Sequence, residues 1–181
     1  RFPTEITVTQ ALSILKEIAV EKNSVEEFSI WIKSNGLSSV SELEIEKASI
    51  SAIEILKDQK KEKQLKKALE DYITNYPNGL DIKKMSFLLG EILYANKKWN
   101  QSILNFKRVV LGPRNEYSEK SIVRICQSLL ELDNTSEATF FLERLEKSAE
   151  AKENLIYAVS NLMKIYYNDK KYNKATLYGE K

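Results

Sequence analysis

The chain has 181 residues, 43% hydrophobic and 30% charged, and its 28 basic and 26 acidic residues leave a net charge of +2. Such a composition is typical of a folded protein with a sizeable core, and the near-balanced charge does not favour nucleic acid or an anionic membrane as a partner. The lack of histidine excludes Ser-His-Asp, Cys-His and histidine–metal centres. The one cysteine, Cys126, cannot form an internal disulfide, so reducing and oxidising compartments both remain open.

Amphipathic helices joined by short polar elbows are predicted along the whole chain, because apolar residues recur at intervals of three and four. The five glycines and three prolines are too few for a turn-rich β fold. In chain order, the expected elbows are 21–23, 59–62, 96–98, 132–134 and 168–171. Connections this short make the flanking helices antiparallel, so each elbow should join one helical hairpin.

The hairpins recur with a nearly fixed period. The residues that open the second helices lie between 34 and 40 residues apart, which is typical of helical-repeat solenoids. These residues are Phe28, Ala68, Ser102, Ala138 and Ala175.

Two second helices carry the sequence signature of a capping box at their start. Ser24 precedes Glu27 by three residues, and Asn134 precedes Glu137 by the same spacing. In each pair we expect the first side chain to accept a free backbone amide of the helix and the glutamate to reach back.

Proline marks the boundaries between hairpins. Pro77 and Pro113 end helices, and Pro3 would close a preceding unit. The serine-rich stretch 33–42 interrupts the rhythm and is expected to be an extended loop between repeats, with a hinge as the alternative.

Both ends of the chain indicate a fragment of a longer protein. The chain starts with Arg1 and ends inside an expected helix, so any upstream targeting signal would lie outside it. No apolar run approaches the roughly 20 residues that span a bilayer.

The third hairpin resembles the tetratricopeptide repeat (TPR). The matching residues are Leu89, Gly90, Leu93, Tyr94, Trp99, Ser102, Phe106 and Pro113, and in the last unit Leu162, Tyr166, Tyr172 and Ala175. The resemblance is good over 45–181 and poor over 1–44. It implies an all-α fold, an α-α superhelix (TPR-like solenoid) of about five antiparallel helical hairpins.

The expected domain organisation follows from that resemblance. Residues 1–44 would form a degenerate first hairpin and a serine-rich loop, and 45–181 a TPR-like array. The units of the array would be about 45–77, 78–113, 114–149 and a truncated 150–181.

A narrower likeness concerns residues 72–110, which are similar to outer-membrane assembly lipoproteins and cell-envelope coordinators. In these a hairpin ends in a Tyr-Pro turn and the next helix carries Leu-Gly-Glu, as at Tyr76-Pro77 and Leu89–Glu91 here. The chain is also similar to internal segments of large multi-repeat proteins exported by some Gram-negative bacteria. The likeness implies a periplasmic or outer-membrane-associated location, with the cytoplasm as the alternative because both signatures also occur in cytoplasmic repeats.

The conspicuous residues of the third elbow are interpreted as packing devices. Gly90 lies inside a helix and is expected where two helices cross closely, facing Ser102 and its neighbours. Trp99 should pack its elbow against its own hairpin; the alternative is a base-stacking platform flanked by Lys97 and Lys98.

No residue is predicted to be catalytic, cofactor-binding or metal-binding. Cys126 lies on an apolar stripe and is expected to be a small buried packing residue. The basic run 57–67 is interpreted as a solvated helix face, with a patch for RNA or an acidic partner as the alternative. The carboxylate pairs Glu26-Glu27 and Glu70-Asp71 lack a convergent partner.

The resemblance places the functional surface on the concave face, which is lined by the first helices. The residues expected there are Lys84, Phe87, Glu91, Tyr94, Lys120, Val123, Gln127, Tyr157, Ser160, Lys164 and Tyr167. Aromatic side chains supply rigid contact area and lysines can meet acidic groups, which suits a peptide or a partner helix. In the alternative interpretation the aromatic side chains only pack between successive units.

The predicted function is a non-catalytic protein–protein interaction scaffold without a cofactor, within a bacterial cell-envelope complex. Nucleic acid is not expected as a partner, nor is membrane insertion of this segment. The alternatives are an RNA-binding helical repeat and a regulatory helical domain of a larger enzyme. Self-association through the uncapped apolar faces of the terminal hairpins is a further alternative.

Overall fold

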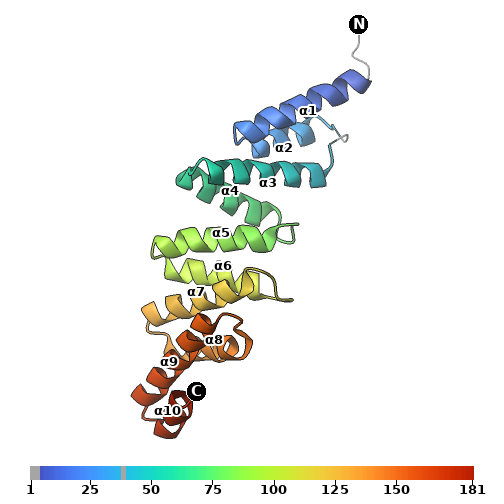
Figure 1. Ribbon diagram of the computed structural model, residues 1–181. Coiled ribbons are helices and arrows are strands. Elements are labelled where there is room, and N and C mark those ends of the chain that lie inside the picture. Colours follow the sequence, from blue (N-terminus) through green and yellow to red (C-terminus); the bar gives the residue numbers. More distant parts are fainter. Residues whose placement is uncertain (1–4, 38–39) are drawn as a thin grey trace. The chain divides into compact units, whose positions relative to one another are not determined.

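The computed structural model describes residues 5–37 and 40–181, and this part of the chain is all-α (Figure 1). Its ten helices are α1 (Glu5–Glu21), α2 (Val25–Ser34), α3 (Glu42–Asp58), α4 (Glu62–Asn75), α5 (Ile82–Ala95), α6 (Trp99–Val110), α7 (Ser118–Glu131), α8 (Thr135–Ser148), α9 (Lys152–Asn168) and α10 (Tyr172–Gly179). Each expected elbow joins two of them, so the predicted all-α array of TPR-like helical hairpins is confirmed. Pro3 and residues 38–39 of the expected loop lie outside the described residues.

All five elbows have the same backbone conformation. Each contains one non-glycine residue with φ between 53° and 59°, namely Asn23, Lys60, Lys97, Asp133 and Lys170. At the third elbow the Lys98 amide donates to the Leu93 carbonyl oxygen at 2.8 Å, and the Lys97 amide donates to that of Tyr94 at 2.9 Å. This pair of bonds is the Schellman motif, and it recurs at the other four elbows. Every elbow is therefore closed by local backbone hydrogen bonds.

The predicted capping boxes are only partly present. The Ser24 side chain makes no capping bond, so that prediction is wrong. Ser24 has φ −122° and ψ 32°, outside the usual N-cap geometry, whereas Asn134 in the same Schellman motif has φ −84° and ψ 70°. At the matching position the longer Asn134 side chain does accept the Glu137 amide, at 3.3 Å.

A full capping box begins α3 instead. The Glu44 amide donates to Ser41 Oγ at 3.2 Å, and the Ser41 amide donates to Glu44 Oε2 at 2.9 Å. The bond from the Ser41 amide, together with one from the Ser41 hydroxyl at 3.0 Å, lowers the pKa of Glu44, because both stabilise its ionised carboxylate.

The described chain divides into two compact units, residues 1–85 (unit 1) and 86–181 (unit 2). A core cluster of unit 1 gathers buried side chains of α1, α2 and α3, among them Leu12, Phe28 and Ile45. The core of unit 2 runs from Ile103 to Ala175. The predicted boundary after residue 44 separates stretches of weak and strong TPR resemblance, and it stays a prediction.

A buried carboxylate fixes the turn that follows α4 in unit 1. Glu46 Oε1 accepts the Tyr72 hydroxyl at 2.6 Å and the Leu80 amide at 2.5 Å. Burial and the Glu46 carboxylate raise the pKa of Tyr72. This tyrosine therefore stays a hydrogen-bond donor between α3 and α4.

A second carboxylate does the same in unit 2. Glu119 accepts the amides of Glu150 and Ala151 at 3.0 and 3.1 Å, and the Asn154 side chain at 2.7 Å. Burial alone would raise the pKa of Glu119, but these hydrogen bonds and the nearby Arg114 outweigh it, so the pKa is lowered. The ionised carboxylate thus caps the start of α9.

The helix crossing at Gly90 is close, as predicted, and the residue nearest to Gly90 is Phe106, one turn beyond Ser102. A Cβ atom on Gly90 would lie 2.7 Å from Cε1 of the buried Phe106 ring. The Ser102 hydroxyl hydrogen-bonds that of Ser128 at 3.2 Å. The packing role of Trp99 is confirmed, since its ring lies edge-on against Tyr94 with 5.1 Å between centroids.

Candidate functional site

The first-helix face of unit 2 is built around the carboxylate of Glu91. Glu91 Oε1 lies 2.8 Å from Arg124 Nε, and Oε2 lies 2.8 Å from Lys120 Nζ, so one residue of α5 holds two cations of α7. Burial raises the pKa of Glu91, but hydrogen bonds from Arg124 and Lys120 outweigh this effect and lower it. The charges that could meet a partner here are therefore satisfied within the protein.

Aromatic rings sit over these cations. The Arg124 guanidinium lies 4.2 Å from the Tyr94 ring centroid, and Lys120 Nζ lies 5.2 Å from that of Phe87. The Tyr94 hydroxyl donates to Gln127 Oε1 at 3.0 Å. The structure thus brings five of the predicted residues together in one network.

Arg124 is the residue that sequence reasoning missed in this network. Its spacing from Glu91 in the chain gives no hint of the contact, because the two residues belong to different hairpins. Val123, the remaining predicted residue of α7, is half-buried and packs against the core.

The predicted residues of α9 are more open. Ser160, Lys164 and Tyr167 are exposed, and the Tyr167 ring packs edge-on against Tyr172 at 5.6 Å. Ile156, which is 54% exposed, lies on the same stripe, since these positions recur at three and four residues. The result is an apolar stripe with one lysine, which we call the α9 stripe (Ile156, Ser160, Lys164 and Tyr167).

Two further predicted residues do not join this open surface. Tyr157 is half-buried, and burial together with the nearby Cys126 and Tyr94 raises its pKa. Lys84 belongs to unit 1, where its Nζ lies 2.5 Å from Glu54 Oε1 of α3.

The other conspicuous side chains have structural roles. Cys126 is fully buried and burial raises its pKa to about 12, which confirms a packing residue. In the basic run, Lys57 pairs with Glu54 at 2.8 Å and Lys66 with Glu70 at 3.4 Å, as on a solvated helix face.

Two kinds of feature are absent from residues 5–37 and 40–181. No cluster of three or more acidic or cysteine side chains there could hold a metal ion. None of the helices in the same ranges is long and apolar enough to cross a bilayer.

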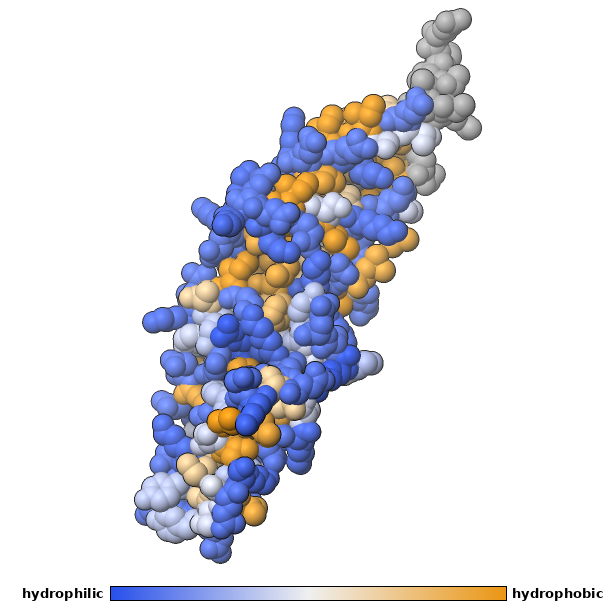
Figure 2. All heavy atoms as spheres, in the orientation of Figure 1, coloured by the Kyte–Doolittle hydropathy of each residue, from blue (hydrophilic) through white to orange (hydrophobic). Residues whose placement is uncertain are grey.

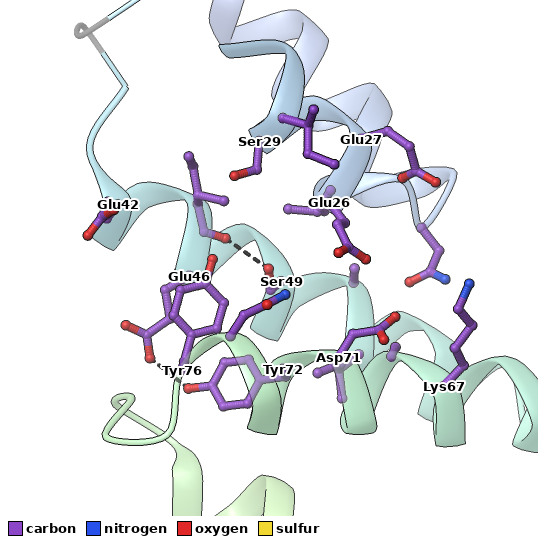
Figure 3. Close-up of a pocket in the computed structure, with 18 of the residues that line it drawn as sticks. Glu26, Glu27, Ser29, Glu42, Glu46, Ser49, Lys67, Asp71, Tyr72 and Tyr76 are labelled. Carbon is purple, nitrogen blue, oxygen red and sulfur yellow. Dashed lines mark hydrogen bonds between the residues drawn. The ribbon is translucent and has the colours of Figure 1, made fainter. Parts of the chain in front are cut away.

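A groove in unit 1 was not predicted. It has a volume of about 470 Å³, lies between α2, α3 and α4, and falls within the roughly 300–1,000 Å³ range of ligand-binding clefts (Figure 3). Exposed apolar side chains, Ile30 and Leu43, stand at its rim. Figure 2 shows hydrophobic residues among hydrophilic ones on the visible face of this unit.

The sequence signal that could have revealed the groove is a set of small side chains at positions where aligned helices carry large ones. Small residues line the groove, and they stand where α6, α7 and α8 carry large ones. Aligning the hairpins on their elbows would have exposed these substitutions.

Comparison with known proteins supports the fold. No family model matches the chain, and no curated protein matches it. Two crystal structures from Podosopora anserina, of a protein described as a kinesin light chain with nearly identical TPR-like repeats, are similar, each with a TM-score of 0.51 and 11% identity. The match covers 99% of this chain and 94% of that chain in one case, and 94% and 91% in the other. The chain therefore has a TPR-like helical-repeat fold.

Proposed function

We propose that the protein is a non-catalytic scaffold that holds another protein on the first-helix face of unit 2. The observation that carries this proposal is the exposed α9 stripe, which lies in the same unit as the network centred on Glu91. The stripe offers exposed apolar area and one cation, whereas the network fixes its own side chains before any partner arrives. Binding to such a preformed surface orders few side chains of the scaffold, which keeps the entropic cost low.

The partner on this face would be a peptide or a helix with apolar anchors and an acidic group. Tyr167 supplies rigid contact area, and Lys164 forms no ion pair with any described residue, which leaves it open to a carboxylate. The ion pairs of Lys84 and Lys120 with glutamates argue against an RNA-binding surface, since a phosphate would have to displace a carboxylate.

A photo-crosslinking pair tests this proposal. A benzophenone amino acid replaces Tyr167, which is 63% exposed, or Phe140 on α8, which is 62% exposed and lies off the face. In cells that make the native protein, we expect a discrete protein adduct from position 167 and none from position 140. Equal adducts at both positions, or none at either, would refute the assignment.

We further propose a location in the cell envelope, within a complex of the outer membrane or periplasm. The support is the likeness of residues 72–110 to envelope-assembly proteins. Fractionation of the producing cell tests it, because the full-length protein should appear with periplasmic or outer-membrane markers. Recovery with cytoplasmic markers would exclude this location.

A further inference from the structure

The groove of unit 1 exists because four large side chains are replaced by small ones. The hairpins can be aligned on the positive-φ residue of each elbow, which pairs α2, α3 and α4 with α6, α7 and α8. In this alignment Ser29, Ser49, Ala52 and Ala68 of the groove correspond in order to Ile103, Ile122, Ile125 and Phe141. All four large residues are buried in the core of unit 2.

The same comparison identifies one missing cation, because Lys33 stands at the position of Lys107 whereas Arg144 has no basic counterpart in unit 1. In unit 2, Lys107 of α6 pairs with Glu137 of α8 and lies 5.9 Å from the Phe141 ring centroid. Arg144 of α8 donates to the Val110 carbonyl oxygen at 3.0 Å. In unit 1, Asp71 stands at the position of Arg144. The aromatic ring and a cation are thus both absent from unit 1, and a carboxylate takes the place of the cation.

The groove is acidic overall. Its lining includes Glu26, Glu27, Glu42, Glu46 and Asp71 but only two lysines, Lys33 and Lys67. Figure 3 shows the Glu26 carboxylate pointing from α2 toward α4, where Asp71 and Lys67 lie.

The carboxylates on the two sides of the groove opening are the ones that a cationic ligand can reach without breaking an ion pair. Glu46 is already held by Tyr72, and Lys33 lies 3.8 Å from Glu42. Glu26, Glu27 and Asp71 form no ion pair with any residue in 5–37 or 40–181. A cation entering the groove would therefore find carboxylates on both α2 and α4.

We propose that this groove binds a polypeptide segment in which an aromatic or large aliphatic side chain is followed closely by arginine or lysine. The apolar side chain fills the space that Phe141 and the isoleucines fill in unit 2, over Ala52 and Ala68. The cation lies between Glu26 and Asp71. This second binding site goes beyond the proposed function, because it uses other helices in another unit and a partner of opposite charge.

A peptide titration tests the groove directly. The probe is N-acetyl-phenylalanyl-arginine amide, added to the ¹⁵N-labelled chain and followed by amide chemical shifts. We expect saturable shifts of Ser29, Ser49 and Ala68 with a Kd of about 1 mM, as befits a short peptide. The matched probe with glutamate in place of arginine should not saturate, since it brings a carboxylate to an acidic groove.

Variants separate the apolar and the charged contributions. Ala68→Phe restores the ring found in unit 2, so it should abolish binding while leaving the helical circular dichroism unchanged. Asp71→Asn should weaken binding about fivefold, the size typical of a half-exposed charge pair. Glu70→Gln on the same helix removes an equal charge outside the groove and should change nothing.

Three results would overturn the proposal. One is equal binding of the arginine and glutamate probes, and another is undiminished binding by folded Ala68→Phe. The third is concentration-dependent dimerisation that Ala68→Phe abolishes, because the occupant would then be a second copy of this chain. None of these results bears on crosslinking at Tyr167, so the two sites fail or succeed independently.

Discussion

The close approach of two helices at Gly90 can be tested by adding one methyl group. In Gly90→Ala the new Cβ would lie 2.7 Å from Cε1 and 2.9 Å from Cδ1 and Cζ of Phe106. Ordinary contact begins at 3.4 Å, so the ring would have to move by about 0.7 Å (3.4 − 2.7). Phe106 is fully buried and also contacts Phe87 at 6.0 Å between ring centroids, so the ring has little room to move.

The size of the effect is a difference of two opposing terms. Overpacking a buried site costs about 1–3 kcal/mol. Alanine gains about 1 kcal/mol over glycine in helix propensity. We therefore expect Gly90→Ala to lower the free energy of unfolding by about 1 kcal/mol, or the melting temperature by roughly 2–4 °C for a chain of this size.

A double-mutant cycle assigns this loss to the Phe106 ring. Phe106→Leu removes Cε1 and Cζ, two of the three atoms that the new methyl group meets. In the Phe106→Leu background, Gly90→Ala should become neutral or stabilising, with a coupling energy of at least about 1 kcal/mol. Urea unfolding followed by circular dichroism measures all four proteins.

Gly179→Ala is the control within unit 2. Its new Cβ would meet only the flexible Met163 sulfur, at 3.3 Å, so stability should stay within about 0.5 kcal/mol of the parent. If Gly90→Ala stabilises the parent chain as it would an isolated helix, the close crossing is not real.

Three further predictions concern an elbow, a carboxylate and the thiol. Lys97 has a φ of 56°, so Lys97→Gly should raise the free energy of unfolding in urea by about 1 kcal/mol. The control Lys98→Gly, at φ −86°, should not raise it. A lower free energy of unfolding in both variants would contradict the left-handed conformation of Lys97. The pKa of Glu119 in the folded protein lies below the ordinary glutamate value of 4.5, so its stabilisation is present above pH 4.5 and is lost as the pH falls through the folded pKa. Between neutral pH and about pH 3, the melting temperature should therefore fall less for Glu119→Gln than for the parent or for the control Glu116→Gln. An equal fall in all three proteins would refute a stabilising role for the Glu119 carboxylate. The Cys126 thiol, buried and with a pKa of about 12, should react with dithionitrobenzoate at neutral pH only after denaturation; rapid reaction of the native chain would rule out its burial.

The helices and elbows could be predicted because they are local. The apolar period of three to four residues locates each helix, and the polar gap locates the elbow within one or two residues. The Schellman motif also uses only neighbouring backbone groups. The Ser24 capping box failed although its residue types fit, because the backbone of Ser24 lies outside N-cap geometry.

Contacts between hairpins could not be predicted with the same success. The sequence indicated a close crossing of Gly90 with Ser102 and its neighbours, but side-chain direction decided that Phe106 is the residue that fills it. The sequence also singled out Glu91 without its partner Arg124, which comes from the next hairpin. The groove of unit 1 was missed because it arises from small side chains at four positions on three helices. A serine or an alanine at any one of these positions is not unusual in a helix.

The repeated elbow has a consequence for how such a protein can change its length. The left-handed residues Lys60 and Lys97 are the same amino acid in the same conformation, and each is followed by another lysine. Removing or duplicating the stretch between them would rejoin an elbow with the same Lys-Lys pair, and the Schellman bonds, which join backbone groups, could form again. Gain or loss of a whole hairpin would therefore leave the elbow able to fold. Selection on the number of hairpins would act through the contacts between helices.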